Sequence, residues 1–534
     1  MEGLDALHAD EHRRTGAGIA MMLRQMQQQR AAADLAVERQ VGREAMFPLQ
    51  REAQEAEIEF ARLGLVEAAQ HGDGGLEDGI VAHARILAGR AARGRAPVRW
   101  RKRGGSARRV DLAALARPAQ ASRLPRLFPS EKTLLMPALA GRLKDIAVSA
   151  SVIMGTRARE LAAEGKKVIS LASGEPDFAT PAHAIEAAHQ AALSGDTKYP
   201  PTEGTRALKL AVQKKFKRDN NLDYALDEIL VANGGKQIIM DALLASCDPG
   251  DEVLIPAPYW VSYADMAKLA TATPTFVNCP QNNGFKLRAE DLDAAITPKT
   301  KWLFLNFPNN PTGASCSRAE MQAIAAVMLK HPHVWILTDD MYEHLVYDGE
   351  FCTIAEVEPR LKDRVLTVNG ASKSYAMTGW RVGFAGGPKA LIKAMANMQG
   401  QLTSGISTIS QAAAVAALEG PQELIAERAA IYRERRDMVV AMLAEAPGMS
   451  CHKPEGAFYV YPNIAGCIGK TSKGGKKLET DTDFALALLE EKLVATVQGT
   501  AYGMSPYIRI SYATDTESLR EACARIQEFC RELA

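Results

Sequence analysis

The sequence has no stretch of apolar residues long enough to span a bilayer, because no such run reaches the ~18 positions that a membrane helix requires. Its start also lacks the pattern of a signal or transit peptide, since Met1 is soon followed by Glu2, Asp5 and Asp10. The formal net charge is only +1, which gives no general attraction to nucleic acid or to anionic membranes. We therefore expect a cytoplasmic protein that binds neither membranes nor nucleic acid.

Cysteine is absent from the first 246 residues, and the eight cysteines that follow lack the C-x-x-C spacing of zinc and redox sites. Reduced thiols of a cytosolic protein explain them most simply, and no metal site is expected. The 534 residues are 47% apolar and 24% charged, which is typical of a globular enzyme with two or more domains.

The first 135 residues differ in composition from the rest of the chain. They hold 20 Arg and 2 Lys, whereas the other 399 residues hold 18 Arg and 24 Lys. The extension, with its basic cluster at 93–109, could be an arm that binds nucleic acid or a partner, but its charge is mixed and no helix-turn-helix pattern is visible. We expect residues 1–135 to be a poorly ordered Arg-rich extension, or upstream sequence translated from a start codon placed too early, with Met136 as the natural start.

Short apolar segments alternate with helical stretches through the middle of the chain. The predicted strands cover residues 229–232, 253–256, 275–278, 302–307, 334–338, 365–368 and 382–385. Helical stretches such as 237–247, 317–329 and 388–399 separate most of them. This order predicts an α/β fold with a mostly parallel seven-stranded sheet and helices on both faces. Ligands of such sheets bind at the carboxyl ends of the strands.

The last third of the chain reads as a smaller α+β domain. Helices are predicted at 422–444, at 483–491 and from 517 onwards, with strands at 456–461, 494–497 and 507–511. In the last strand, Ile508 and Ile510 should face one side and Arg509 the other. An arginine in this position either clamps a carboxylate with two hydrogen bonds or forms a structural ion pair.

The segment at 368–384, V-N-G-A-S-K-S-Y-A-M-T-G-W-R-V-G-F, most strongly indicates chemistry. The apolar run before it should bring Lys373 out at the end of a buried strand. A lysine amine shielded from water and close to other cations loses its proton readily and can form a Schiff base with a carbonyl. Ser372 and Arg381 would suit a phosphate. The alternative is an ordinary surface lysine at a strand end.

Polar and aromatic residues also follow other predicted strands. Gly235 and Lys236 open a helix whose N–H groups can hold a phosphate. Trp260 could stack on an aromatic ring or pack at the rim of the core, and Asn310, fixed before a proline, can donate its amide to a phenolate-like oxygen. Asp339, if buried at its strand end, needs a cationic partner such as a protonated pyridine nitrogen, or else it caps a following helix.

The segment around Lys373 resembles the cofactor-lysine segment of class I aminotransferases, which are pyridoxal-phosphate enzymes of fold type I. From about residue 149 to 534 the chain is similar to bacterial aspartate aminotransferases of subgroup Ib. The shared motifs are G-E-P-D at 174–177, K-Y-P-P-T-E-G at 198–204, N-F-P-N-N-P-T-G at 306–313 and D-D-M-Y-E at 339–343. The resemblance implies an aminotransferase that moves an amino group between an L-amino acid and a 2-oxo acid through pyridoxal 5′-phosphate (PLP).

The resemblance also implies an organisation. The fold would be that of fold type I PLP-dependent transferases, with the seven-stranded sheet in one domain and the smaller α+β domain beside it. Residues 136–180 would be an N-terminal segment joining the small domain, 181–415 the large PLP-binding domain and 416–534 the small C-terminal domain. Two chains would form a homodimer.

The resemblance gives the catalytic residues their tasks. Lys373 would carry the cofactor and shuttle the proton between the substrate Cα and the cofactor. Asp339 would keep the pyridine nitrogen protonated, and Asn310 and Tyr342 would bond to the 3′ oxygen of the ring.

A second set of residues would bind the rest of the cofactor and the substrate. The phosphate would be held by Gly235, Lys236, Ser372, Arg381 and Tyr199 of the partner subunit. Trp260 would stack on the ring. The α-carboxylate of the substrate would be bound by Arg509, Gly174 and Asn310.

The substrate side-chain pocket departs from the resembled pattern. Close relatives have a lysine directly before a Pro-Ser-Ala-Thr motif, and this lysine meets the distal carboxylate of the substrate. Here Ala147 takes its place, and Lys144 lies three residues upstream. Aspartate, prephenate, aromatic and other partners therefore stay open. A carbon–sulfur lyase, a cyclopropane-forming synthase or a transcription regulator with an aminotransferase-like domain are the alternatives.

Overall fold

The computed structural model describes residues 140–146 and 148–534, all of which belong to one unit, Glu131–Ala534. The predictions for residues 1–135, for Met136 and for Ala147 lie outside the described residues. No helix in the described ranges is both long and apolar enough to cross a membrane.

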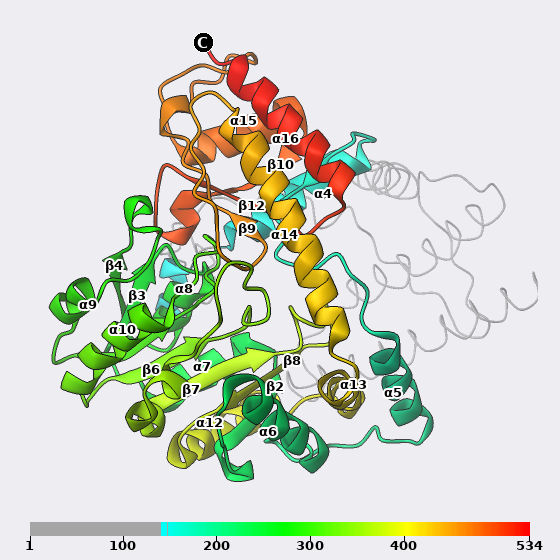
Figure 1. The fold of residues 1–534 in the computed structure, drawn as a ribbon, viewed down its shortest axis with the longest axis vertical. Helices are drawn as coiled ribbons and strands as arrows, with labels where there is room; N and C mark the ends of the chain where they lie inside the picture. Colours follow the sequence, from blue (N-terminus) through cyan, green and yellow to red (C-terminus); the bar gives the residue numbers. More distant parts are fainter. Residues whose placement is uncertain (1–139, 147) are drawn as a thin grey trace, which may run out of the picture. The chain divides into compact units, whose positions relative to one another are not determined.

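A seven-stranded sheet forms the centre of the larger part of the unit (Figure 1). Its strands are β2 (Ile229–Asn233), β3 (Glu252–Ala257), β4 (Thr273–Asn278), β5 (Thr300–Leu305), β6 (Trp335–Asp339), β7 (Val365–Gly370) and β8 (Val382–Gly386). They lie in the order β2-β8-β7-β6-β5-β3-β4, and only β8 runs antiparallel to its neighbours. The predicted mostly parallel sheet is therefore confirmed, strand by strand.

Both faces of the sheet are covered by helices, because alternate residues of the inner strands enter different cores, whereas the edge strand β4 buries only Val277. In β5, Leu303 and Leu305 join one core, whereas Trp302 and Phe304 join the other. The first core includes α5 (Ala182–Leu193), α6 (Arg206–Asn220), α9 (Ala289–Ala295), α10 (Arg318–Lys330), α11 (Ile354–Val357) and α13 (Thr408–Glu419). The second includes α7 (Gly235–Ser246), α8 (Ser262–Leu269) and α12 (Lys389–Leu402). Burial on both faces explains why these strands read as continuous apolar runs.

The smaller α+β part is built on a third core. Its helices are α14 (Glu423–Ala444), α15 (Asp481–Lys492) and α16 (Thr516–Arg531), with α14 and α16 packed side by side (Figure 1). Its antiparallel sheet has the order β11 (Val497–Gln498), β12 (Ile508–Ser511) and β9 (Tyr459–Val460). The N-terminal segment adds α4 (Ala150–Ala163) and β1 (Ile169–Ser170), which pairs in parallel with β10 (Val494–Ala495).

The single strand predicted at 494–497 was wrong. The structure has two short strands, β10 and β11, which belong to different sheets on either side of Thr496. Val494 pairs in parallel with Ile169, whereas Val497 pairs antiparallel with Arg509. The chain changes its hydrogen-bonding neighbour at Thr496, so one continuous ladder cannot form.

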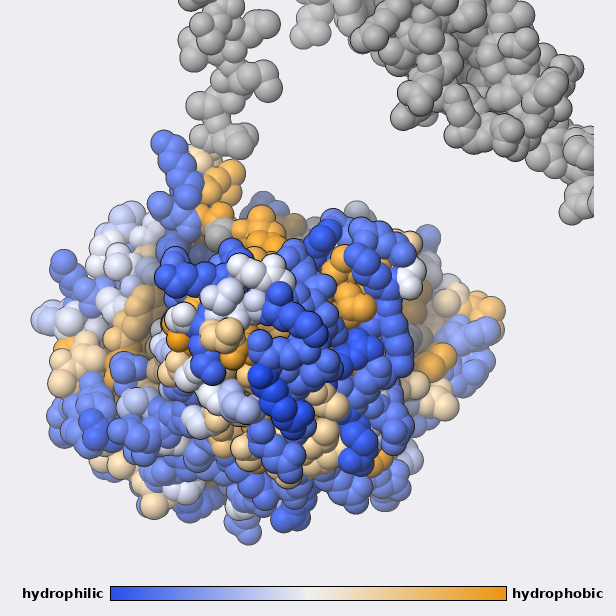
Figure 2. Space-filling view, turned by 90° about the horizontal axis from the view of Figure 1, so that it is seen from above, coloured by the Kyte–Doolittle hydropathy of each residue, from blue (hydrophilic) through white to orange (hydrophobic). Residues whose placement is uncertain are grey.

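The surface of the described residues is mainly hydrophilic in the view of Figure 2, with apolar residues in small groups. The most exposed large apolar side chains include Val148 (67%), Val152 (55%), Ile153 (51%), Leu193 (70%) and Tyr199 (92%). These five precede the central sheet in the sequence, as do most of the exposed large apolar side chains of the described residues, whereas Phe276 (48%) and Leu402 (53%) do not.

Candidate active site

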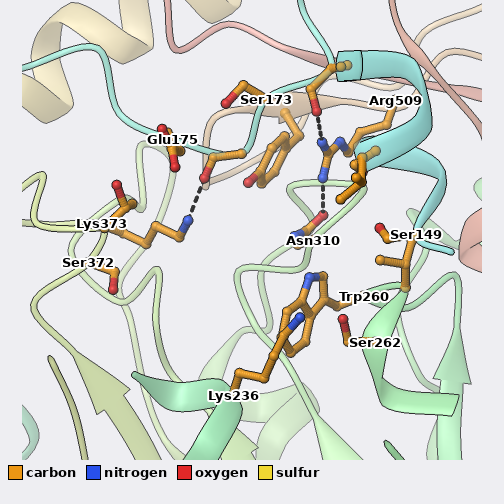
Figure 3. Close-up of a pocket in the computed structure, with 18 of the residues that line it drawn as sticks. Ser149, Ser173, Glu175, Lys236, Trp260, Ser262, Asn310, Ser372, Lys373 and Arg509 are labelled. Atoms are coloured by element: carbon orange, nitrogen blue, oxygen red, sulfur yellow. Dashed lines mark hydrogen bonds between the residues drawn. The ribbon is translucent and has the colours of Figure 1, made fainter. Parts of the chain in front are cut away.

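A cavity of about 810 Å³ opens where the strands of the large sheet end (Figure 3). Its position agrees with the rule that parallel sheets bind ligands at the carboxyl ends of their strands. The structure brings together all of the predicted site residues except Tyr199: the cavity is lined by Gly174, Gly235, Lys236, Trp260, Asn310, Asp339, Tyr342, Ser372, Lys373, Arg381 and Arg509.

Lys373 lies three residues beyond the end of β7 and points into the cavity (Figure 3). Its Nζ donates a hydrogen bond to the carbonyl oxygen of Gly174. Burial lowers the pKa of Lys373 to about 8, and the positive charge of Arg509 acts in the same direction. An amine with this pKa is deprotonated much more often at neutral pH than an exposed lysine, so it is a competent nucleophile and base.

Asp339 is the last residue of β6 and is 8% exposed. Its Oδ2 accepts a hydrogen bond of 2.5 Å from the hydroxyl of Tyr263, but its Oδ1 has no partner among the described residues. Burial raises the pKa of Asp339, although the Tyr263 hydrogen bond and the charge of Lys373 oppose this. The chain after Asp339 forms a turn, not a helix, so the alternative role as a helix cap does not apply. A buried carboxylate oxygen without a donor is poised to accept one from a ligand.

Arg509 lies in β12 and is 3% exposed. Ile508 and Ile510 pack into the core of the smaller part, and Arg509 faces the cavity, as strand alternation predicts. Its Nη1 donates to Asn310 Oδ1 at 3.1 Å, and its Nη2 donates to the carbonyl of Ala172 at 2.6 Å. Its Nε has no partner among the residues described, so this guanidinium has a donor left to bind an anion.

The start of α7 and Arg381 form another wall of the cavity. Gly234, just before the helix, has φ 83°, and a Cβ there would lie 2.6 Å from Arg381 Nη2. Arg381 itself adopts φ 59°, which is uncommon for a residue other than glycine. Lys236 Nζ lies 5.0 Å from the centre of the Trp260 ring, and burial together with Arg381 lowers the pKa of Lys236. A helix N-terminus and two cations therefore meet on this side.

Two buried phenols lie side by side near Lys373. The Tyr342 and Tyr459 hydroxyls are 2.8 Å apart, and the Lys373 Nζ lies 5.9 Å from the centre of the Tyr342 ring. Burial raises the pKa of Tyr342 well above its ordinary value and that of Tyr459 to about 12. Both therefore stay protonated at neutral pH and can donate hydrogen bonds. A Cβ at Gly174 would lie 2.9 Å from the Tyr459 hydroxyl, so glycine is required there for this packing.

Tyr199 takes no part in the cavity of its own chain. It lies in the loop between α5 and α6 and is 92% exposed. Its expected contact with the cofactor phosphate of a second subunit stays a prediction.

Three residues that organise the site were not predicted from the sequence. Tyr263 donates to Asp339, and Tyr459 bonds to Tyr342. Asn306 Nδ2 donates to the Asp339 carbonyl at 2.8 Å, while its Oδ1 accepts from the Asn310 backbone N–H at 2.9 Å. Tyr263 lies three residues after Trp260, and Asn306 opens the N-F-P-N-N-P-T-G motif. Both residues therefore lie close in sequence to predicted site residues, which was only a weak indication of their roles.

Comparisons with known proteins agree with this geometry. Residues 166–526 match the family described as aminotransferase class I and II. The chain is 53% identical over 396 residues to an aspartate aminotransferase of Rhizobium meliloti (strain 1021), which covers 74% of this chain and 97% of that protein. It is 54% identical over 400 residues to an aspartate/prephenate aminotransferase of Cereibacter sphaeroides, covering 75% of this chain and 100% of that protein.

Solved structures show the same similarity in three dimensions. The crystal structure of the Rhizobium meliloti aspartate aminotransferase matches with a TM-score of 0.72 at 52% identity, covering 74% of this chain and 100% of that chain. A structure of the Thermus thermophilus aspartate aminotransferase with maleate matches with a TM-score of 0.69 at 38% identity, again covering 74% of this chain and 100% of that chain.

Proposed function

Because this chain belongs to the class I and II aminotransferase family, we propose that it binds PLP at Lys373 and uses it to transfer an amino group between an L-amino acid and a 2-oxo acid. The observation that carries the proposal is the content of one cavity. A lysine with a lowered pKa, a buried carboxylate with a free oxygen and a buried arginine with a free donor all face it.

The described residues fit the chemical groups of PLP. The free Oδ1 of Asp339 suits a protonated pyridine nitrogen, which supplies the donor that this buried oxygen lacks. The wall formed by the α7 N-terminus, Lys236 and Arg381 suits a phosphate, and the absence of a side chain at Gly234 leaves room for the Arg381 guanidinium. The indole of Trp260, which lines the same wall, offers a flat surface for stacking.

When bound, PLP supplies an aldehyde that takes up the amino group and a conjugated ring that accepts electrons from the substrate Cα. Lys373 would hold the cofactor and then, as a free amine, would shuttle the proton between the substrate Cα and the cofactor. Its lowered pKa suits both tasks. Asp339 keeps its charge opposite the ring nitrogen, with Tyr263 fixing its second oxygen. Tyr342 and Asn310 would donate to the 3′ oxygen of the ring.

Arg509 binds the α-carboxylate of the substrate. The guanidinium is held in place by Asn310 and by the carbonyl of Ala172, so it is oriented before the substrate arrives. A Cβ at Gly174 would lie 2.9 Å from the Tyr459 hydroxyl and 4.0 Å from Arg509 Nη1, so glycine keeps this side of the arginine uncovered. Lys373 bonds to the Gly174 carbonyl, and Arg509 Nη1 lies 4.0 Å from where a Gly174 Cβ would be, so the bound α-carboxylate keeps the substrate Cα near the Lys373 amine.

Aspartate is the proposed amino donor, with prephenate as a candidate acceptor. The support comes from the relatives, which are aspartate and aspartate/prephenate aminotransferases at 53% and 54% identity. The charged residues that line the cavity are five cations and two carboxylates: Arg159, Lys236, Lys373, Arg381 and Arg509 against Asp339 and Glu175. This charge balance suits a substrate with more than one carboxylate.

The proposal includes a cytoplasmic homodimer in which Tyr199 of the partner subunit completes the phosphate site. The exposure of Tyr199 together with Val152 and Ile153 supports an interface in this part of the chain. The eight cysteines are free thiols, which suits a reducing compartment. The domain division at 136–180, 181–415 and 416–534 is supported by the position of the large sheet between Ile229 and Gly386.

A panel of amino acids tests the proposed function. The PLP-loaded protein is mixed with one amino acid at a time, and the cofactor absorbance and the released product are followed. Aspartate should convert the cofactor to its amine form and release a 2-oxo acid in stoichiometric amount. Release of pyruvate with ammonia, or no spectral change with any amino acid, would contradict an aminotransferase activity.

A further inference from the structure

The last turns of α6 carry polar residues that the proposed reaction does not use and that lie outside the cavity. They are Lys215, Arg218, Asp219 and Asn220, here named the α6 anchor. Lys215 is 2% exposed and Asn220 5%. Buried charged and amide groups need partners, and in this case the partners lie in the two segments that carry the proposed catalytic residues.

The first segment is held through Glu343, which is 5% exposed. The Lys215 ammonium pairs with Glu343 Oε1 and also donates to Asn220 Oδ1 at 2.7 Å. The Asn220 amide in turn donates to Glu343 Oε2 at 2.7 Å. Both oxygens of this carboxylate are therefore fixed from α6, and a closed buried network of this kind is rigid.

His344 extends the same network. Its Nε2 lies 3.2 Å from Glu343 Oε1 and 3.5 Å from Asp219 Oδ2. Although burial opposes its charge, the two carboxylates raise the pKa of His344 to about 9. Asp219, Glu343 and His344 could together hold a metal ion, but the Lys215 ammonium already supplies the positive charge that these carboxylates need. The network is an ion cluster of the chain's own residues.

The second segment is held through Tyr375, which is 2% exposed. Its hydroxyl donates to Gln422 Oε1 at 2.6 Å, and Arg218 Nη2 reaches the same oxygen at 3.5 Å. Arg218 is in turn fixed by Asp219, whose Oδ1 accepts from Arg218 Nε at 2.6 Å. The same turn of α6 is therefore connected to both segments.

We propose that the α6 anchor is a positioning device that sets the distance between the Lys373 amine and the Asp339 and Tyr342 side chains. Glu343 directly follows Tyr342, and Tyr375 comes two residues after Lys373. Each segment is bonded to the sheet at its first residue, where Asp340 N–H donates to Val368 and Ala371 N–H donates to Val382. Beyond these residues both segments run as turns, so the sheet alone does not fix the side chains that follow. The inference rests on the proposed function, because these side chains must reach one cofactor ring.

Two variants release the segments, and a third serves as a matched control. Removing only one partner of the Lys215–Glu343 pair would leave a buried charge without a partner. The double variant Lys215→Met/Glu343→Leu therefore replaces both with apolar side chains. Arg218→Met removes the contact of α6 with Gln422 Oε1, to which the Tyr375 hydroxyl donates. The control is Lys209→Met, which removes another buried lysine of α6, one paired with Glu203 at 2.9 Å and in contact with neither segment. All three are made in the full chain and compared for melting temperature.

Hydrogen–deuterium exchange of the cofactor-free protein tests the anchor without reference to any activity. The double variant should exchange amides of residues 340–346 at least about 10-fold faster than the wild type, and Arg218→Met should do the same for residues 371–377. Lys209→Met should change neither segment. Wild-type exchange in 340–346 of the double variant, or in 371–377 of Arg218→Met, overturns the inference.

The functional consequence is read with the cofactor bound. A displacement of about 1 Å lowers the rate of a positioned reaction about 100-fold, so kcat should fall about 10- to 100-fold in both releasing variants. KM for the amino donor should stay within about threefold, because Arg509 is held by other residues. The pH midpoint of the cofactor absorbance should also move. Wild-type kcat and midpoint would refute the positioning role. If the wild type binds no PLP, the proposed function is contradicted instead. The hydrogen–deuterium exchange of the cofactor-free protein would still show whether the α6 anchor holds the two segments.

Discussion

Tyr263→Phe removes one hydroxyl and leaves the aromatic ring, so it tests how the charge of Asp339 is maintained. Among the described residues this hydroxyl is the side-chain donor to Asp339, at 2.5 Å from Oδ2, and Oδ1 has no partner. The hydrogen bond lowers the pKa of Asp339 against the effect of burial. Without it, the pKa of Asp339 rises further and the carboxylate is less often charged when PLP binds.

The size of the effect follows from the burial of the pair. A hydrogen bond to a charged group contributes ~1.5–3 kcal/mol, and Asp339 is only 8% exposed, so little solvent screening reduces this value. The ratio of charged to protonated Asp339 should therefore fall by about 10- to 100-fold. PLP affinity at pH 7 should fall about 10-fold or more, and the loss of protein stability should shrink as the pH decreases, because a protonated carboxyl no longer needs the donor.

Equilibrium dialysis of PLP from about pH 5 to 9 measures this directly. The acid limb of the affinity profile should move to higher pH in Tyr263→Phe. Tyr259→Phe is the matched control, since the Tyr259 hydroxyl makes no hydrogen bond among the described residues and its ring stacks on Phe276 instead. Superimposable profiles for Tyr263→Phe and the wild type would refute the argument.

Three further predictions concern other parts of the cavity. The rate of PLP attachment should rise with pH through about 8 and then level off, because the Lys373 amine must lose its proton and its pKa is about 8; a stopped-flow absorbance profile that stays flat in this range would contradict the assignment. Arg509→Lys should raise KM for the amino donor by about 10-fold or more and leave the cofactor spectrum unchanged, because lysine cannot form the two-pronged contact; steady-state kinetics with an unaltered KM would rule out this role. Gly234→Ala should weaken PLP binding by about 10-fold, because its Cβ would meet Arg381 Nη2 at 2.6 Å. Gly250→Ala, which has positive φ but nothing within 4 Å, is the control for backbone strain, and equal PLP affinity in the two variants would exclude the clash.

Much of the fold could be predicted from the sequence, because strands that are buried on both faces have continuous apolar sequences. The site could be located for a related reason. Asn310, Asp339 and Lys373 follow strands that end at the same edge of the sheet, and this edge is where ligands bind.

The remainder depends on tertiary contacts that no local pattern encodes. Tyr459 reaches Tyr342 across 117 residues of sequence, and Asn220 reaches Glu343 across 123. The break at Thr496 was missed because Val494 to Val497 reads as one strand until its two different pairing partners are known. Arg218 and Gln422 gave no signal, since single polar residues at helix ends are common.

The central claim is that Lys373 carries PLP opposite the carboxylate of Asp339. Borohydride reduction of the PLP-loaded protein followed by peptide mass spectrometry tests it most directly. The account predicts one pyridoxyl group per chain, on the peptide that contains Lys373, and its loss in Lys373→Ala. A modified lysine elsewhere, with Lys373 unmodified, would contradict it.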